Sequence, residues 1–554
     1  MESLRTVKDQ STSARSREQW LDEADAVLRT QGLEAAASLA SAALADGIEE
    51  PSLMNLAAST HFSRGELDEA MRLLKRANEL APNDPHVLNS LGVCLKAGGN
   101  ADAALKAFDG AISIDPKIAP AHFNRGTVLD DAGELQSARA AYEQALALNP
   151  DYLEACAALA WIDAQTGNAS AAKANGEQVL SRSPGNVLAC MAVASADLQH
   201  GNLAAAAARL MPLSQDPGLS QLNRSIVVGM IADIYDATNR PAEAFAVYQA
   251  SNMLLKTMHP EFEAPGRETA LGRVKRLTDW FGLADRAAWH EAPQLQRLSE
   301  MPDAHIFLVG FPRSGTTLLE NVLAAHPRVV SLEEKPLLDD AEATYLASNE
   351  GLERLSRIDA SEAERLRDRY WSFVRGFGVD LIGNVFIDKM PLASVQLPLI
   401  AKLFPDARIL FAIRDPRDVV LSCFRRRFAM NASMFELLTI DGAAVFYDAV
   451  MRLSELYRNV LPLPQHIVRY ENLVNDFEST AGAAFQFLGL DWDPGVAQFA
   501  DRARERGIGT PSATQVVRGL NREGQDAWRR YRDQIAPALP LLERWVERFS
   551  YASE

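Results

Sequence analysis

The chain has 554 residues, of which 47% are hydrophobic and 23% are charged, and its formal net charge is −17. This length predicts roughly two to four domains, and the composition is typical of a folded globular protein rather than a disordered chain. The negative charge argues against a general nucleic-acid-binding role, so any site for an anion must be a local patch.

The cysteines and the first residues bear on the compartment. The four cysteines lie far apart, and none has the spacing of a metal site or a redox pair. We therefore expect buried thiols in a reducing compartment. Residues 1–19 lack the apolar segment of a secretion signal, and no run of about 18 apolar residues is present that would span a membrane. These features predict a cytoplasmic protein without a membrane span.

A period of 34 residues dominates the first half of the chain, after a polar segment at residues 1–18 that we expect to be disordered. Each recurring glycine fits a turn between two helices, each alanine a close helix contact, and each proline the end of a unit. The pattern resembles the tetratricopeptide repeat and predicts about six or seven helix–turn–helix units over residues 19–256. The recurring residues are Gly65, Gly99, Gly133, Gly167 and Gly201; Ala70, Ala104, Ala138, Ala172 and Ala206; and Pro82, Pro116, Pro150 and Pro184.

Such an array commonly presents a concave surface to a partner, so we expect it to bind a polypeptide acceptor or a protein partner. A plain structural scaffold is the alternative. Residues 257–302 break the period at two Pro-containing segments and then continue as an amphipathic helix,. This stretch is predicted to be a helical connector that packs the array against the next domain.

Short apolar strands alternate with helices over residues 303–554. This alternation predicts an α/β domain with a central parallel sheet, whose ligand lies at the carboxyl ends of the strands. The predicted fold is therefore an all-α solenoid followed by a P-loop-like α/β domain. The predicted strands are Ile306–Val309, Val385–Asp388, Arg408–Ile413 and His466–Arg469.

The segment Gly310-Phe-Pro-Arg-Ser-Gly-Thr-Thr317 joins the first of these strands to a helix. A Gly-bearing turn before a helix N-terminus is typical of an anion site, because backbone N–H groups and the helix dipole face the ligand. The loop is close to the Walker A pattern, but Thr316 stands in place of the lysine and Arg313 supplies the cation. Triphosphate hydrolysis is therefore disfavoured, and a nucleotide kinase remains only as an alternative.

A second basic motif follows the strand Arg408–Ile413. Arg414 comes at the strand end, and Ser422 and Arg426 are four residues apart, on one face of the following helix,. Two guanidinium groups and a hydroxyl suit a terminal phosphate. The alternative is an ordinary solvated basic helix face.

Together these two motifs resemble those of the sulfotransferase family, and of the tyrosylprotein sulfotransferases in particular, over residues 303–545. The resemblance implies 3′-phosphoadenosine 5′-phosphosulfate as the donor and no metal. It implies a 5′-phosphosulfate loop at Arg313, Ser314, Gly315, Thr316 and Thr317, and a 3′-phosphate motif at Arg414, Ser422 and Arg426.

The same resemblance implies further roles for single residues. Glu334 takes the place of the catalytic base, with His326 as the alternative, and Lys389 takes the place of the catalytic lysine. Two positions depart from the tyrosyl enzymes, because Pro336 replaces an arginine and Ala527 replaces a lysine. Further donor contacts are implied for Tyr470 and, in a late loop, for Ser512, Gln515, Arg518 and Asn521.

The predicted function is transfer of a sulfuryl group to a hydroxyl, with Glu334 accepting the proton and Arg313 and Lys389 stabilising the developing charge. The acceptor is predicted to be a protein tyrosine or another polypeptide-presented hydroxyl, bound with help from the repeats. One alternative is a glycan or small-metabolite sulfotransferase whose repeats serve as a partner scaffold. Another is an interaction scaffold with a degenerate enzyme domain.

Overall fold

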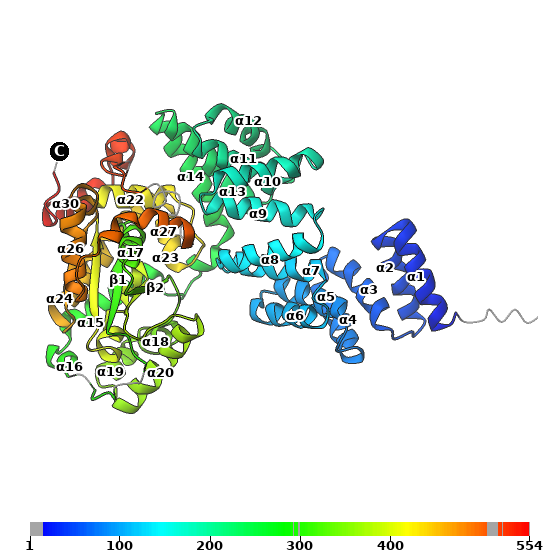
Figure 1. The fold of residues 1–554 in the computed structure, drawn as a ribbon, viewed down its shortest axis with the longest axis horizontal. Helices are drawn as coiled ribbons and strands as arrows, with labels where there is room; N and C mark the ends of the chain where they lie inside the picture. The colour runs from blue at the N-terminus through cyan, green and yellow to red at the C-terminus, as the bar shows by residue number, and fades with distance from the viewer. Residues whose placement is uncertain (1–14, 292, 297–299, 507–518, 523, 553–554) are drawn as a thin grey trace, which may run out of the picture. The chain divides into compact units, whose positions relative to one another are not determined.

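The computed structural model describes residues 15–291, 293–296, 300–506, 519–522 and 524–552. The chain divides into two compact units, Met1–Ile162 and Asp163–Glu554. Figure 1 shows the helices and strands of each unit.

The first unit consists of consecutive helices that pack in pairs. At the turn between the fifth and sixth helices, Gly99 has a φ of 77°, in the left-handed region that favours glycine,. In the same pair Gly92 faces Phe108, whose ring would lie only 2.5 Å from a Cβ at this position, so the two helices meet closely. The helices are α1 (Arg17–Gln31), α2 (Leu33–Ala45), α3 (Pro51–Ser63), α4 (Leu67–Leu80), α5 (Pro85–Ala97), α6 (Ala101–Ile114), α7 (Ala119–Asp131), α8 (Leu135–Leu148) and the start of α9 (Leu153–Gln165).

The second unit continues the repeat pattern before the fold changes. Its first helices are α10 (Ala169–Arg182), α11 (Val187–Gln199), α12 (Leu203–Ser214), α13 (Gln221–Ala237) and α14 (Pro241–Met258). Along the described chain, α1 to α14 are fourteen consecutive helices, the number that seven helix–turn–helix units contain. Next come η1 (Pro260–Glu263), α15 (Ala270–Leu283) and α16 (Arg286–His290). The predicted domain boundaries at residues 18, 256 and 302 stay predictions.

A five-stranded parallel sheet forms the centre of the second unit. Its strands are β1 (Ala304–Gly310), β2 (Val329–Glu333), β3 (Val385–Lys389), β4 (Arg408–Ile413) and β5 (Gln465–Arg469), in the order β2-β3-β1-β4-β5. The chain leaves β1 for β2 and β3 on one side and then crosses to β4 and β5 on the other side. Ligands of such sheets bind at the carboxyl ends of the strands where the direction reverses, here beside β1. The predicted fold class is confirmed.

Four of these strands are predicted from the sequence, and β2 is not. Its five residues include Ser331 and Glu333, so they lack the run of apolar residues found in β1, β3 and β4,.

Helices and short 3-10 segments cover the sheet. They are α17 (Thr316–Ala324), α18 (Asp339–Tyr345), α19 (Asn349–Ser356), α20 (Ala360–Gly376), η2 (Pro391–Val395), α21 (Leu397–Leu403), α22 (Pro416–Arg425), α23 (Ala432–Phe435), η3 (Glu436–Leu438), α24 (Ile440–Val460), α25 (Tyr470–Asn475), α26 (Phe477–Leu488), η4 (Pro494–Gln498), α27 (Phe499–Arg506), η5 (Ala527–Tyr531), α29 (Arg532–Ile535) and α30 (Leu539–Arg548).

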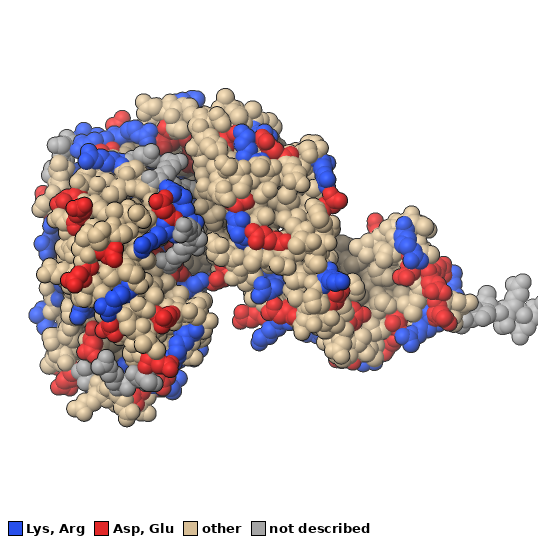
Figure 2. All heavy atoms as spheres, in the orientation of Figure 1, with Lys and Arg blue, Asp and Glu red and all other residues tan. Residues whose placement is uncertain are grey.

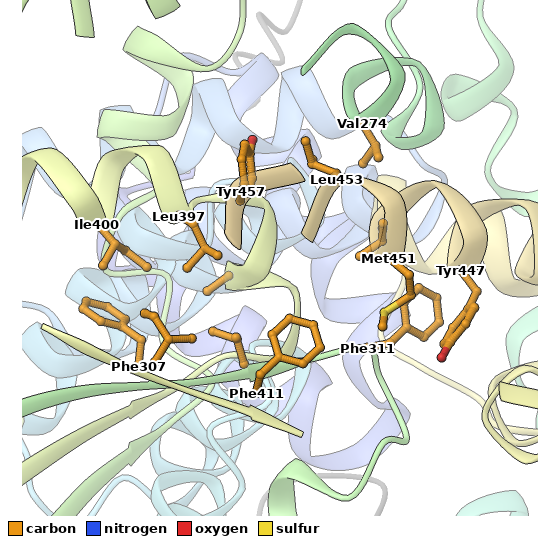
Figure 3. Close-up of a cluster of buried hydrophobic side chains, with 14 of the residues drawn as sticks. Val274, Phe307, Phe311, Leu397, Ile400, Phe411, Tyr447, Met451, Leu453 and Tyr457 are labelled. Atoms are coloured by element: carbon orange, nitrogen blue, oxygen red, sulfur yellow. The ribbon is translucent and has the colours of Figure 1, made fainter. Parts of the chain in front are cut away.

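Both faces of the sheet are buried, because successive strand residues point to opposite sides. On β1, Phe307 and Val309 belong to one core cluster, whereas Ile306 and Leu308 belong to another. Figure 3 shows the first cluster, where Phe307, Phe311 and Phe411 meet side chains of α15, α21 and α24. The second cluster packs α17 and α26 against the opposite face. This double packing holds the strand ends, and the loops after them, in fixed positions.

On the face that Figure 2 shows, acidic and basic side chains are interspersed among larger areas of other residues. Within the described part of the chain, no helix combines the length and the apolar character that crossing a membrane requires.

A buried polar network lies beneath the sheet edge. Tyr370 on α20 donates from its hydroxyl to Asp388 Oδ2, at 2.8 Å, and the same hydroxyl lies 2.9 Å from His305 Nε2. Burial raises the pKa of Asp388 to about 7, although the Tyr370 hydroxyl favours the carboxylate. Burial also lowers the pKa of His305 to about 3.

The raised pKa of Asp388 predicts a pH-dependent stability. An unfolded aspartate has a pKa of about 4, so the folded state holds the proton more tightly, and the contribution of Asp388 to stability falls as the pH rises from about 4 to about 7. Asp388→Asn cannot ionise and should lose less stability over that range, by up to about 1.4 kcal/mol for each pH unit. Urea unfolding of both proteins at about pH 5 and about pH 8 measures the difference. His305 is common to both, so parallel pH profiles would contradict the assignment.

Candidate active site

The loop between β1 and α17 is a tight turn at the carboxyl edge of the sheet. Gly310 leaves no room for a side chain, because a Cβ there would lie 2.6 Å from the backbone oxygen of Ala412 on β4. Gly315 has a φ of 94°, and a Cβ there would lie 2.8 Å from the ring of Tyr470. Arg313 also has a positive φ, 69°, which is unusual for a residue with a side chain,. Such strained positions concentrate at functional sites.

The N-terminus of α17 faces the space that this loop encloses. Its N-cap is Gly315, which has no side chain to accept from the first N–H groups of the helix,. Thr316 and Thr317 are buried. The first turn therefore offers backbone donors and the positive end of a helix dipole to an anion.

The motif after β4 is joined directly to this loop. Arg313 Nε donates to Ser422 Oγ of α22, at 3.0 Å, and Arg414 Nη1 donates to the backbone oxygen of Arg313, at 3.1 Å. The Arg414 guanidinium also lies over the ring of Tyr470, 4.9 Å from its centroid. The structure thus brings together the predicted residues of both phosphate motifs, with Tyr470 beneath them.

Positive charge accumulates at this junction. Burial, followed by the nearby Arg426 and Arg414, holds the pKa of Arg313 below its usual value. Burial likewise lowers the pKa of Arg426. Arg414 Nε is buried and has no hydrogen-bond partner among the described residues. A bound dianion would stabilise all three charges, so this donor set fits a phosphate group.

The predicted catalytic pair lies at the ends of β2 and β3. Lys389 is fully buried, and its Nζ lies 2.7 Å from Glu334 Oε1 and 3.3 Å from Glu333 Oε1. Glu320 of α17 is the third carboxylate, 3.6 Å away and 1% exposed. Burial opposes the charge of Lys389, but the carboxylates outweigh it and raise its pKa above the usual value. Glu334 is the exposed member of the group, and its φ of 49° turns it out of the strand.

One cavity of about 590 Å³ is lined by the loop after β1 and by Glu334, whereas Arg414, Ser422 and Arg426 of the second motif are not part of its lining. Glu334 and the loop residues Arg313, Gly315, Thr316 and Thr317 lie in its wall, together with Pro336. Lys389 does not line the cavity, so its resolved contacts are with the carboxylates and not with the open space. The predicted role of Lys389 in stabilising the developing charge stays a prediction.

The rest of the cavity wall is formed by residues for which the sequence predicts no catalytic or binding role. Connector helix α15 contributes Arg273 and Val274, and Glu342 accepts hydrogen bonds from both Arg273 and Gln396. Met390, Phe428, Met434 and Phe446 supply apolar surface. Glu320 is also absent from the prediction, although a single glutamate within the apolar run of α17 was a signal for it.

The predicted late loop is only partly visible. Ser512, Gln515 and Arg518 lie outside the described residues. Asn521 Nδ2 donates to the oxygen of Gly519, at 3.2 Å. Beyond it, the oxygen of Gly524 accepts from Arg414, so the chain after the late loop reaches the second phosphate motif.

The segment after the late loop, residues 524–528, is also held by the buried carboxylate of Asp418. Asp418 of α22 accepts from the backbone nitrogens of Asp526 and Trp528, both at 2.9 Å. The Arg417 guanidinium lies 4.1 Å from the centroid of the Trp528 ring.

His326, the alternative base, does not line the cavity and lies against Phe485 of α26.

The comparisons with known proteins agree with this architecture. Residues 305–494 match the family model described as the sulfotransferase family. Residues 21–85, 61–124 and 119–152 match tetratricopeptide-repeat models. The chain therefore carries a sulfotransferase-family domain that follows a tetratricopeptide array in the sequence. Both resemblances are confirmed.

Two curated relatives show the extent of the similarity. An uncharacterized protein of Aquifex aeolicus (strain VF5) is 26% identical over 259 residues, which are 44% of this chain and 33% of that protein. Protein-tyrosine sulfotransferase 1 of Danio rerio is 27% identical over 240 residues, 40% of this chain and 65% of that protein. This chain thus spans less than two thirds of either relative. The sulfotransferase domain of the Synechococcus PCC 7002 olefin synthase is 23% identical and covers 46% of this chain and 98% of that domain, but its TM-score of 0.28 adds no argument.

The buried cluster around Lys389 predicts a strong effect on stability. Lys389→Met removes the cation that Glu320 faces inside the protein, and breaking a buried ion pair costs about 3–5 kcal/mol. Adding Glu320→Gln to Lys389→Met removes one of the stranded carboxylates and should recover part of that loss. Urea unfolding of the wild type, both single variants and the double variant measures the coupling. A cost below about 1 kcal/mol for Lys389→Met, or no recovery in the double variant, would contradict the account.

Proposed function

We propose that this protein is a sulfotransferase that moves a sulfuryl group from 3′-phosphoadenosine 5′-phosphosulfate to the hydroxyl of a protein tyrosine or another polypeptide. The observation that carries the proposal is the hydrogen bond from Arg313 to Ser422, at 3.0 Å. It joins two anion-binding motifs at the switch point of the sheet, next to a cavity that exposes a carboxylate. A donor with a 5′-phosphosulfate and a 3′-phosphate needs two such motifs side by side.

The chain's residues fit this donor on chemical grounds. The N–H groups of α17 and the Arg313 guanidinium suit the 5′ phosphosulfate. Ser422, Arg414 and Arg426 suit the 3′-phosphate, because Arg414 Nε is buried without a hydrogen-bond partner among the described residues and can donate to it,. Thr316 occupies the position of a P-loop lysine, which argues for a donor other than a triphosphate. When bound, the donor supplies the sulfuryl group and leaves as adenosine 3′,5′-bisphosphate.

Glu334 is the proposed general base. It is exposed in the same cavity as Arg313 and Thr317, and Lys389 holds its carboxylate at 2.7 Å. The acceptor's O–H proton would pass to Glu334 while its oxygen forms a bond to sulfur and the bridging oxygen–sulfur bond breaks. A phenol, with a pKa of about 10, requires such a base near neutral pH. Arg313 would balance the charge that develops on the departing phosphate.

The proposed polypeptide acceptor draws support from the repeats, because arrays of this kind bind partner proteins, and from the similarity to protein-tyrosine sulfotransferase 1. One observation favours the second candidate, a small-metabolite sulfotransferase. The cavity of about 590 Å³ has the size of a small-molecule site,. Pro336 in its wall also replaces the arginine of the tyrosyl enzymes.

An acceptor assay tests the proposed function. The full chain is incubated with radiolabelled 3′-phosphoadenosine 5′-phosphosulfate and matched panels of tyrosine peptides, glycans and small phenols. Label on peptides, at higher kcat/KM than on free phenols, is the expected result. Label on small phenols or glycans alone would support the second candidate. No label on any acceptor, together with no binding of adenosine 3′,5′-bisphosphate, would contradict the proposed donor chemistry.

Substitution of the proposed base gives a sharper prediction. Glu334→Gln keeps the shape of the side chain and removes its basicity, so kcat should fall by about 100-fold or more. The dissociation constant for adenosine 3′,5′-bisphosphate should change by less than about two-fold, because the base touches the acceptor. Steady-state kinetics and calorimetric titration measure the two quantities.

The neighbouring carboxylate supplies the matched control. Glu333 also contacts Lys389, but Glu334 is the one that lines the cavity. Glu333→Gln should therefore retain kcat within about three-fold, since it removes no group from the reacting atoms. Equal losses in the two variants would assign the effect to the buried cluster and remove Glu334 as the base.

A further inference from the structure

The last helix pair of the array, α13 and α14, packs on the C-terminal end of α22. Asn252 of α14 is 4% exposed, and its Nδ2 donates to the backbone oxygen of Phe424, at 2.9 Å. The rings of Phe245 and Phe424 are stacked with centroids 4.7 Å apart. The final carbonyls of a helix have no partner within it, so Asn252 satisfies one that α22 leaves open. A repeat side chain therefore fixes the end of the helix that carries Ser422.

Charge pairing strengthens the same contact. Arg425 forms an ion pair with Asp236 of α13, and its guanidinium lies 5.4 Å from the ring centroid of Tyr248. Arg427 Nη2 lies 3.5 Å from Asp233 Oδ2, and Asp233 also accepts from the Tyr248 hydroxyl, at 2.6 Å. Arg425 and Arg427, the outer two of three consecutive arginines, are thus paired with carboxylates of the repeat.

The middle arginine is different. Arg426 is the C-cap of α22 and forms no ion pair within the described residues. It lies between two arginines whose side chains are held by Asp236 and Asp233. Burial lowers its pKa although the nearby Asp233 partly opposes this, so a further anion would stabilise the charge,. The ion pairs of the repeat are with Arg425 and Arg427, so Arg426 is the arginine of this run whose guanidinium is available to the 3′-phosphate motif.

We propose that Asn252, Asp236 and Asp233 are positioning residues of the donor site, and that the last repeat is a structural part of 3′-phosphate recognition. They act through α22, whose end they hold, so that Ser422 and Arg426 face the position of the 3′-phosphate. This inference rests on the proposed donor. It also means that the donor site depends on residues 221–258. A shortened protein that begins after residue 256 would lack all three side chains.

Calorimetric titration of the full chain tests the inference with two probes. Adenosine 3′,5′-bisphosphate carries the 3′-phosphate, and adenosine 5′-monophosphate lacks it. Asn252→Ala and Asp236→Asn should each weaken bisphosphate binding by about ten-fold and change monophosphate binding by less than about two-fold. The control is Asn202→Ala at the exposed N-cap of α12, whose side chain forms no cap hydrogen bond. It should bind both probes like the wild type.

The two probes separate positioning from folding. A loss of folded protein lowers the fraction of active sites and affects both probes alike, so an equal change for the two nucleotides would overturn the inference. Unchanged binding of the bisphosphate in both variants would overturn it as well. If Asn252→Ala does not fold, Asp236→Asn alone decides, because it keeps the shape of the side chain. A wild type that binds both probes equally would contradict the proposed donor itself.

Discussion

Burial of like charge is the constraint on which the site depends. Arg313, Arg414 and Arg426 converge on the edge of the sheet beside β1, and burial together with their mutual repulsion lowers the pKa of Arg313. Such a cluster is stable only if the rest of the fold holds it firmly. The hydrogen bond from Arg313 to Ser422 and that from Arg414 to the Arg313 backbone supply this hold. The proposed donor, with its two phosphate groups, would add negative charge to this cluster.

The second charge cluster has the opposite balance. Around the buried Lys389, the carboxylates of Glu320, Glu333 and Glu334 outnumber the cation, and Glu334 alone is exposed in the cavity. The proposed base after β2 and the proposed donor cradle after β1 thus line the same cavity, with β3 between their strands. The register of β2, β3 and β1 fixes their separation, since Glu333 pairs with Lys389 and Leu308 also pairs with Lys389. The sheet, rather than any flexible loop, sets the geometry of the proposed transfer.

Much of this arrangement is predictable from local patterns. The period of 34 residues predicts the repeats, and the Gly-bearing loop and Arg414-to-Ser422 spacing predict the two phosphate motifs. β2 is not predicted because it has only five residues and lacks a continuous apolar run,. The contact from Asn252 to Phe424 spans 172 residues and leaves no periodic trace. The place of α15 in the cavity wall is equally hard to predict, because the sequence of an amphipathic helix does not reveal which surface it covers. Long-range packing, not local propensity, decides these features.

A crystal structure of the full chain with adenosine 3′,5′-bisphosphate would test the central claim most directly. The account predicts the 5′-phosphate at the N-terminus of α17, within hydrogen-bond distance of Thr316 and Thr317, and the 3′-phosphate at Ser422, Arg414 and Arg426. It also predicts that Glu334 stays exposed toward the open part of the cavity. A nucleotide bound in the reverse orientation, or away from the loops after β1 and β4, would contradict the account.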